Sequence, residues 1–388
     1  MQEYLAYRGG PFFNLQRRLG LIWEASLNAG RRALIFVGIA WLVPLVLTLP
    51  GSMGPEELPF GNSYLTDIGA WGKYVIAIAA FLLSEKQVEE RLRLSLRQFL
   101  AAPLLDPSAF PAAAGLIDQA LNRRDSRVAE WLFVLLGYLA AAWSLGHLFR
   151  LDHTSWAVVH GVDGNHITLA GWWTTLVSLP LFWFLMLRGL WRHLVWAMLL
   201  RAFAGLRLRL VASHPDSHGG LGFLADYPNA YAVFVLGVSA AAAAAFAKHL
   251  SGQALIPSTL TTGMMVWLAF VVALFAFSLS AFRKPLRELK EASLMACSTQ
   301  ATQYQRKLEK KMLGRNTVAD NPDEFDPAAE PQDPGKLFES ARKLSPTLTS
   351  RSSIVPLAAA ALLPYALVGF SQIPFKEVLS IVKKLILI

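Results

Sequence analysis

The sequence predicts an all-α integral membrane protein, a polytopic bundle of six to seven transmembrane helices with helices that extend into the cytoplasm. The chain of 388 residues is 54% hydrophobic and only 16% charged, whereas soluble domains carry about 25% charged residues. Its apolar residues gather in stretches about as long as the ~20 residues that a membrane-spanning helix needs. Its basic residues gather in alternate connections between these stretches, as they do in polytopic membrane proteins.

Each predicted span is an apolar stretch bounded by polar or turn-forming residues. Pro44 predicts a kink in the first span, and Trp71 marks interface depth in the second. The last stretch is the weakest because it contains Pro356 and Pro364. The seven stretches are residues 33–49, 68–83, 130–149, 167–187, 230–247, 261–282 and 354–370.

The distribution of basic residues predicts the orientation. Thirty of the 36 Lys and Arg residues lie before the first span or in alternate connections on that same side. Because positive charge marks the cytoplasmic side, the N-terminus is predicted to be cytoplasmic. The net charge of +9 then needs no nucleic acid as a partner. It follows from basic loops that face the anionic lipids of the bilayer.

Four regions follow from these patterns. The first is a cytoplasmic interfacial helix, and the second is the six-span region with a cytoplasmic helical extension and a loop. The third is a cytoplasmic helix followed by a disordered, acidic, proline-rich linker. The fourth is a seventh span or a re-entrant hairpin that ends in an amphipathic helix. Their ranges are residues 1–32, residues 33–282 with the extension 84–127 and the loop 201–226, residues 283–353, and residues 354–388.

A polar, glycine-rich stretch, SHPDSHGGLGF, interrupts the apolar sequence before the fifth span. His214, Asp216 and His218 offer two imidazoles and a carboxylate, which suit zinc or another divalent metal. The alternative is a structured turn, in which Asp216 accepts hydrogen bonds from backbone amides. The glycines of that turn would permit positive φ and close packing under the fifth span; they are Gly219, Gly220 and Gly222.

A second group of histidines falls in a predicted outer loop. His153, His160 and His166 are candidates for a divalent metal site or for a pH sensor, because imidazole titrates near neutrality. Their irregular spacing is also typical of an ordinary solvated loop.

Basic residues near the membrane form the third group of candidates. Arg188 and Arg192 lie one helical turn apart on one face, beside His193. They are predicted to contact lipid headgroups or to line a cytoplasmic vestibule that attracts anions. Lys73 reaches the outer interface or else faces a pore. The absence of an acidic residue deep in any predicted span argues against a proton-coupled carrier.

The segment LRLVASHPDSHGGLGFL resembles a stretch of bacterial polytopic inner-membrane proteins of about this length. The resemblance implies a bacterial inner membrane as the location and carries no activity with it.

Three function classes remain open from the sequence. A channel or transporter for an ion or small solute is favoured, because most of the chain is in the membrane and no catalytic motif is present. It would act alone or as a homo-oligomer, since the alanine-rich fifth span permits close helix packing. The alternatives are a metal-dependent membrane enzyme that uses the His214 loop, and a sensor or scaffold that signals through residues 283–353.

Overall fold

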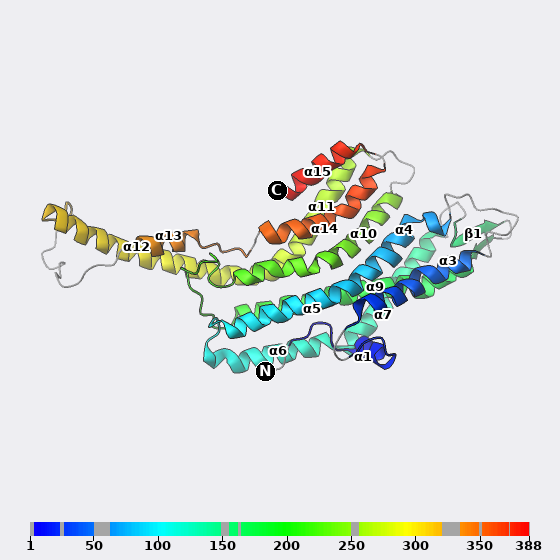
Figure 1. The fold of residues 1–388 in the computed structure, drawn as a ribbon, viewed down its shortest axis with the longest axis horizontal. Coiled ribbons are helices and arrows are strands. Elements are labelled where there is room, and N and C mark those ends of the chain that lie inside the picture. Colours follow the sequence, from blue (N-terminus) through cyan, green and yellow to red (C-terminus); the bar gives the residue numbers. More distant parts are fainter. Residues whose placement is uncertain are drawn as a thin grey trace.

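The structure is a computed structural model that describes residues 4–23, 27–49, 63–148, 155–161, 164–249, 256–319, 334–348, 351–371 and 373–387. It is a bundle of long helices that run side by side (Figure 1). One helix, α12 (Arg283–Leu313), projects from one end of the bundle, and a hairpin of two short strands lies at the other. We call these ends the arm end and the hairpin end.

Within the described residues, seven helical stretches are long and apolar enough to cross a membrane. This confirms the predicted all-α polytopic class, with the addition of one antiparallel hairpin formed by β1 (Val158–Gly161) and β2 (Gly164–Ile167). The seven stretches are Ala29–Thr48, Ile68–Ala101, Pro107–Leu148, Leu169–Ala204, Gly222–His249, Pro257–Leu313 and Ser353–Phe370.

Each of the first four stretches is built from several consecutive elements, and the third is interrupted by a turn at Asp125–Ser126. The first contains α2 (Ala29–Val37), a π-helical turn η1 (Gly38–Leu42) and α3 (Val43–Thr48). The others contain α4 (Ile68–Ala70), η5 (Trp71–Ala77) and α5 (Ile78–Ala101); η6 (Pro107–Ala109), α6 (Phe110–Arg124) and α7 (Arg127–Leu148); and α8 (Leu169–Trp173), η7 (Thr174–Ser178) and α9 (Leu179–Ala204).

The last three stretches, with the flanking helices, complete the bundle. They contain η8 (Gly222–Tyr231) and α10 (Ala232–His249); α11 (Pro257–Leu279), η9 (Ser280–Phe282) and α12; and α14 (Arg351–Phe370). Three shorter helices lie outside them: α1 (Pro11–Arg18), α13 (Gly335–Lys343) beside α12, and α15 (Phe375–Leu387). A single-turn 3-10 helix, η4 (Tyr64–Thr66), precedes α4.

The small residues of α10 let it pack closely inside the bundle. A Cβ atom at Gly72 would lie 2.9 Å from the carbonyl oxygen of Ala240, and one at Gly237 would lie 2.9 Å from the Cβ of Ala80. Close backbone approach of this kind is how membrane helices associate. The alanine-rich face of α10 is therefore used within the chain, against η5, α5 and α14.

The chain reverses after α14, and α15 packs back against α14 and α11 (Figure 1). Val378 and Leu385 of α15 are buried in a small core with Leu260 and Leu362. The C-terminal tail is thus a helix that packs one apolar face against the preceding stretch. The acidic linker predicted at the end of the third region falls largely on residues 320–333, which lie outside the described residues.

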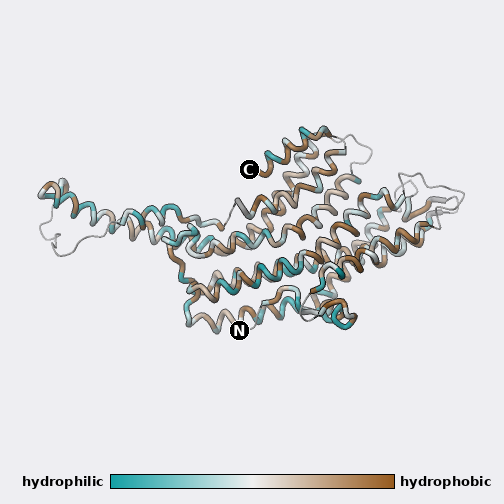
Figure 2. Tube along the Cα trace, in the orientation of Figure 1, coloured by the Kyte–Doolittle hydropathy of each residue, from teal (hydrophilic) through white to brown (hydrophobic). Residues whose placement is uncertain are grey.

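Hydropathy along the trace follows the bundle. Figure 2 shows hydrophobic colours along the helices that run toward the hairpin end and many hydrophilic residues along α12. Apolar side chains of α7 face outward, among them Trp131, Leu135 and Trp143. Lipid provides the apolar surroundings for such a surface in an integral membrane protein.

Candidate functional site

Five charged side chains meet where α2, α5, α7 and α9 come together, and we call them the charged network. Both carboxylate oxygens of Glu85, on α5, form ion pairs. Oε2 lies 2.5 Å from Nη1 of Arg32 on α2, and Oε1 lies 2.8 Å from Nη1 of Arg188 on α9. Glu130, in the first turn of α7, has one oxygen 3.7 Å from Arg188 Nε and 3.9 Å from Arg192 Nη2. Four segments distant in sequence are therefore joined by ion pairs.

The charged network is buried within the bundle. Its five residues are between 1% and 6% exposed. Glu85 is 17 residues from the start of α4, which is about 26 Å along a helix, and a bilayer core is ~30 Å thick. Three guanidinium groups face two carboxylates, so the network carries one excess positive charge. Burying such groups costs several kcal/mol per ion, and only mutual pairing offsets this cost.

The N-terminal segment, residues 4–18, covers the network from the arm end. Arg192 donates to the carbonyl oxygens of Ala6 at 2.7 Å and Gly9 at 3.0 Å. The amide of Phe12 donates to Glu130 at 2.7 Å. The amide of Tyr7 donates to Glu89 of α5 at 3.0 Å. The segment thus supplies the polar partners that water would supply in an open site.

Gly10 is the point of closest approach between this segment and the network. Its φ is +90°, and a Cβ atom there would lie 2.7 Å from Glu130 Oε1. The backbone conformation therefore favours glycine, and an added Cβ would require the Glu130 carboxylate to shift. The rings of Tyr7 and Phe12 complete the cover, because the Arg188 guanidinium lies 5.7 Å and 5.3 Å from their centroids, within cation–π range.

An aromatic layer lies next to the network on the side of the hairpin end. Phe81 precedes Glu85 by one helical turn, and its ring centroid is 5.9 Å from that of Phe182 and 5.0 Å from that of Phe234. Three helices, α5, α9 and α10, contribute these rings. Gly189 makes room for Phe234, since a Cβ there would lie 2.2 Å from the ring. The interior thus changes from apolar to charged within about one turn.

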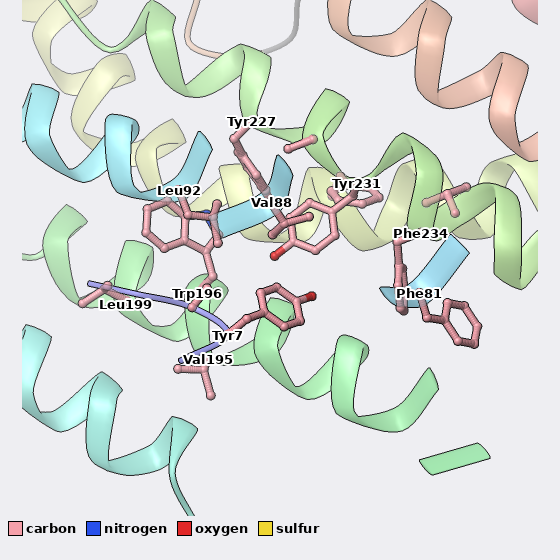
Figure 3. Packing of buried hydrophobic residues seen from close by; sticks show 14 of the residues in the cluster. Tyr7, Phe81, Val88, Leu92, Val195, Trp196, Leu199, Tyr227, Tyr231 and Phe234 are labelled. Carbon is pink, nitrogen blue, oxygen red and sulfur yellow. The ribbon is translucent and has the colours of Figure 1, made fainter. Parts of the chain in front are cut away.

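Several buried polar atoms belong to aromatic side chains of the core, among them Tyr7, Trp196 and Tyr231 (Figure 3). The hydroxyls of Tyr4, Tyr7 and Tyr231 and the indole nitrogen of Trp196 have no hydrogen-bond partner among the described residues. Burial raises the pKa of the Tyr4 hydroxyl to about 12, so it stays protonated near neutral pH. Buried polar groups in proteins nearly always have partners. Ordered water is the usual partner of buried polar groups of this kind.

The loop around Asp216 forms a tight turn. Oδ1 of Asp216 accepts hydrogen bonds from the amides of His218 at 2.8 Å and Gly220 at 3.2 Å, and Oδ2 accepts one from Gly222 at 2.8 Å. His214 Nδ1 lies 2.8 Å from Oδ1. Burial opposes ionisation of Asp216, but these hydrogen bonds outweigh it and hold the pKa of the carboxyl below its ordinary value.

The residues proposed as metal ligands are committed to this turn. His218 Nδ1 lies 2.6 Å from the carbonyl oxygen of Asp216. Throughout the described part of the chain, no group of three or more His, Cys, Asp or Glu side chains is arranged to hold a metal ion. Since Asp216 already uses both oxygens for amides of its own loop, the observed arrangement corresponds to the structured-turn alternative.

The loop also joins three parts of the arm end. Gly219 and Gly220 have φ of +66° and +96°, and Cβ atoms there would approach Leu286 of α12 at 3.3 Å and Leu104 at 2.9 Å. The amide of Ser345, beyond α13, donates to the carbonyl oxygen of Ser217 at 2.8 Å. The loop therefore fixes the base of α12 to the connection after α5 and to the segment after α13.

We expect Asp216→Ala to loosen this junction. Loss of three hydrogen bonds to a carboxylate should lower the free energy of unfolding by about 1–3 kcal/mol. Because the native pKa is lowered, the wild-type contribution is present above the unfolded pKa of about 3.9 and is lost as pH falls through the native value. Proteolysis rates within the loop measure the effect. Asp118→Ala, at an exposed position of α6, is the control, and equal rates for both variants would contradict the expectation.

The other predicted site residues lie away from the network. His153 is outside the described residues. His160 and His166 belong to the two strands of the hairpin, where the backbone register places them opposite Asn165 and Val159. Lys73 is partly buried in η5 near the hairpin end. In that region the Asp67 carboxylate caps α4 and accepts hydrogen bonds from the Lys248 ammonium and the Trp156 indole. Burial opposes ionisation of Asp67, but Lys248 and these bonds hold its pKa below the ordinary value.

Two sequence expectations need correction. Arg188 and Arg192 do not reach lipid headgroups or an open vestibule, because the structure buries both, with His193, inside the bundle. His193 lies 3.2 Å from the Ser278 hydroxyl. No burial of acidic residues was expected either: Glu85 follows the predicted second span by two residues and Glu130 is the first residue of the predicted third span, yet both are buried within the bundle. The sequence offered one usable signal, namely that Arg32, Glu85, Glu130 and Arg188 all fall at the same predicted end of their spans.

Comparisons of the chain with protein-family models, with curated proteins and with solved structures gave no match. The functional argument therefore depends on the site itself.

Proposed function

We propose that this integral membrane protein is a channel or transporter for a small anion, with the charged network and the N-terminal segment as its inner gate. One observation carries the proposal: three arginines and two glutamates are buried together inside a bundle of membrane-crossing helices. Ionisable residues are costly in such a position and commonly mark ion or substrate pathways.

The chemistry of the site favours an anion. The network has one more basic than acidic group, and a low-dielectric interior strengthens the attraction between that excess charge and an anion. The rings of Phe81, Phe182 and Phe234 resemble the hydrophobic constrictions that close pores by excluding water. An anion that passes this layer meets Arg188 next.

Three π-helical turns support a pathway along the same helices. η1, η5 and η7 lie in the first, second and fourth membrane-crossing stretches, and both η5 and η7 contact η1. The indole of Trp173 donates to the carbonyl oxygen of Ile39 at 2.9 Å, which ties two of these stretches together. π-Helical turns are frequent at functional sites. With the arm end placed in the cytoplasm by its basic residues, the gate faces the cytoplasm of a bacterial cell.

The test is anion flux in liposomes that contain the purified protein. We expect iodide to enter faster than into protein-free liposomes, and the reversal potential to follow the anion gradient. Arg188→Gln should reduce iodide flux by about tenfold or more, since a loss of 1.4 kcal/mol of attraction is tenfold in an equilibrium constant. Arg201→Gln is the matched control on α9, because Arg201 is exposed and contacts Phe277.

Two results would contradict the proposal. One is a reversal potential that follows the cation gradient. The other is iodide entry no faster than into protein-free liposomes, both for the wild-type protein and for the Gly10→Ala variant that is described in the Discussion.

A further inference from the structure

A groove lies on the surface of the bundle, away from the charged network, and we call it the α11 groove. The helices α10 and α11 both pack against α14 (Figure 1), and the groove is lined by all three. Phe246 comes from α10, Tyr365 from α14, and the rest of the lining from the part of α11 between Ser258 and Phe270. Its volume of about 650 Å³ is typical of sites for small molecules.

The α11 groove opens toward the hydrocarbon layer. Its wall on α11 belongs to a membrane-crossing stretch, and Val266 and Phe270 on this wall are 66% and 59% exposed. From Ser258, in the first turn of α11, to Phe270 the wall is about 18 Å long. One leaflet of a hydrocarbon core of ~30 Å is about 15 Å thick. The groove therefore extends through one leaflet, the one at the end of α11 opposite to α12.

The polarity of the lining changes along the groove. Ser258 and Thr262 contribute hydroxyl groups near the start of α11, whereas Val266 and Phe270 further along are apolar. Thr261 donates to a carbonyl oxygen of its own helix at 2.7 Å, but the Thr262 hydroxyl forms no hydrogen bond with another described residue. A phospholipid has the same order, with oxygen atoms at the membrane boundary and an apolar chain below them.

Tyr365 places a second free hydroxyl at the floor of the groove. Its side chain is only 5% exposed, and its ring centroid lies 5.6 Å from that of Phe246 and 6.3 Å from that of Trp267. The Tyr365 hydroxyl has no hydrogen-bond partner among the described residues. Because buried polar groups nearly always have a partner, the groove offers a hydrogen-bond donor to an oxygen atom of a ligand.

The apolar walls of the groove are fixed by packing. The indole nitrogen of Trp267 donates to the Ser239 hydroxyl of α10 at 2.9 Å, which holds α10 and α11 together. The rings of Trp267 and Phe270 stack with centroids 5.6 Å apart. A Cβ atom at Gly263 would lie 3.0 Å from the Phe246 ring, so the two walls approach closely there. A ligand therefore meets a preformed surface, which lowers the cost of binding.

We propose that the α11 groove binds one acyl chain of a membrane phospholipid from the leaflet at the hairpin end. The chain lies along Val266 and Phe270, and the hydroxyls of Thr262 and Tyr365 donate to oxygen atoms of the lipid. The charge of the headgroup plays no part, since no charged side chain is among the lining residues. The groove shares no residue with the charged network, so this binding does not depend on anion conduction.

Retention of lipid by the purified protein tests the site. The protein is incubated with phosphatidylcholine in detergent and washed, and the retained lipid is counted by native mass spectrometry. Val266→Trp fills the groove with an indole and should retain about tenfold less lipid than the wild type, because the burial of about two methylene groups accounts for a tenfold change in affinity. Met265→Trp is the matched control, since Met265 is 51% exposed and outside the lining, and it should retain lipid as the wild type does.

A second measurement locates the retained chain. Phosphatidylcholine that carries bromine atoms on its acyl chains quenches the fluorescence of tryptophan residues that it touches. After unbound lipid has been washed away, the remaining quenching should come from Trp267 and should disappear in Trp267→Phe. Trp143→Phe is the control, because Trp143 is 77% exposed on α7, and this variant should keep the remaining quenching.

Three outcomes would overturn the site. One is equal retention of phosphatidylcholine by Val266→Trp and Met265→Trp, and another is quenching that Trp267→Phe leaves unchanged. The third is a wild-type protein that retains no lipid and is a dimer, while Val266→Trp is a monomer, since a second copy of the chain would then fill the groove. If Val266→Trp aggregates, Thr262→Phe replaces it and is judged in the same way. No outcome is read from anion flux, so the proposed pathway stands or falls separately.

Discussion

Glu85→Gln should destabilise the protein by about 3–5 kcal/mol, because it leaves Arg32 and Arg188 buried without their common counter-charge. Glutamine keeps the size of the side chain, so the effect is electrostatic and not a cavity. The midpoint and free energy of denaturation in detergent measure it. This is the largest stability effect that we expect when one charged side chain of the network is replaced by a neutral side chain of similar size.

Glu90→Gln is the matched control for this experiment. It lies five residues further along α5, is exposed, and pairs only loosely with Lys86, so its effect should be within about 0.5 kcal/mol. In the double variant Glu85→Gln/Arg188→Gln, one of the two guanidinium groups that shared the Glu85 carboxylate is gone, and part of the stability should return. If Glu85→Gln behaved like Glu90→Gln, the network would not hold the helices together.

The second large effect concerns the cover over the network. Gly10→Ala should raise anion flux through liposome-reconstituted protein by about tenfold, because it displaces residues 4–18 from Glu130 and Arg192. A Cβ at Gly10 would lie 2.7 Å from Glu130 Oε1. Overpacking of this size costs about 1–3 kcal/mol, and 1.4 kcal/mol shifts a two-state population tenfold.

Gly20→Ala is the control for this flux experiment. Gly20 also has positive φ, +68°, but a Cβ there meets nothing within 4 Å. Both substitutions carry the cost of an L residue at positive φ, and this cost is larger at Gly10, where φ of 90° and ψ of 166° lie in a region that is essentially restricted to glycine. Only Gly10→Ala adds the collision with the network. Equal flux in the two variants would therefore show that the N-terminal segment does not close a pathway.

The sequence predicted the membrane-crossing stretches well, because hydropathy is a property of each segment alone. The stretch predicted at 68–83 begins at the residue where α4 begins, and its predicted continuation as a helix is α5, which ends at Ala101. The stretch at 33–49 was predicted to begin four residues late, since Arg31 and Arg32 look like flanking charges. Arg32 is instead buried by its pairing with Glu85.

The site was less accessible to sequence reasoning because its contacts join segments far apart in the chain. Within α5, Lys86 pairs with Glu90 one helical turn away, which is a spacing that a sequence can reveal. Glu85 and Glu89 pair across the bundle instead, with Arg188 and Arg8. Spacing within one helix cannot reveal a partner 103 positions away. The loop at Asp216 was easier to predict, since the hydrogen bonds that the Asp216 carboxylate accepts come from amides two to six residues away.

The helix that leaves the bundle has a mechanical consequence. From Pro257 to Leu313 the chain is one helical stretch of 57 residues, interrupted only by the 3-10 turn at Ser280–Phe282. The 31 residues of α12 form a lever about 46 Å long, so a tilt of about 5° at its base moves its tip by roughly 4 Å. The Asp216 loop packs against the base of α12 close to the 3-10 turn, so a small change of angle at this base would be enlarged at the tip of α12.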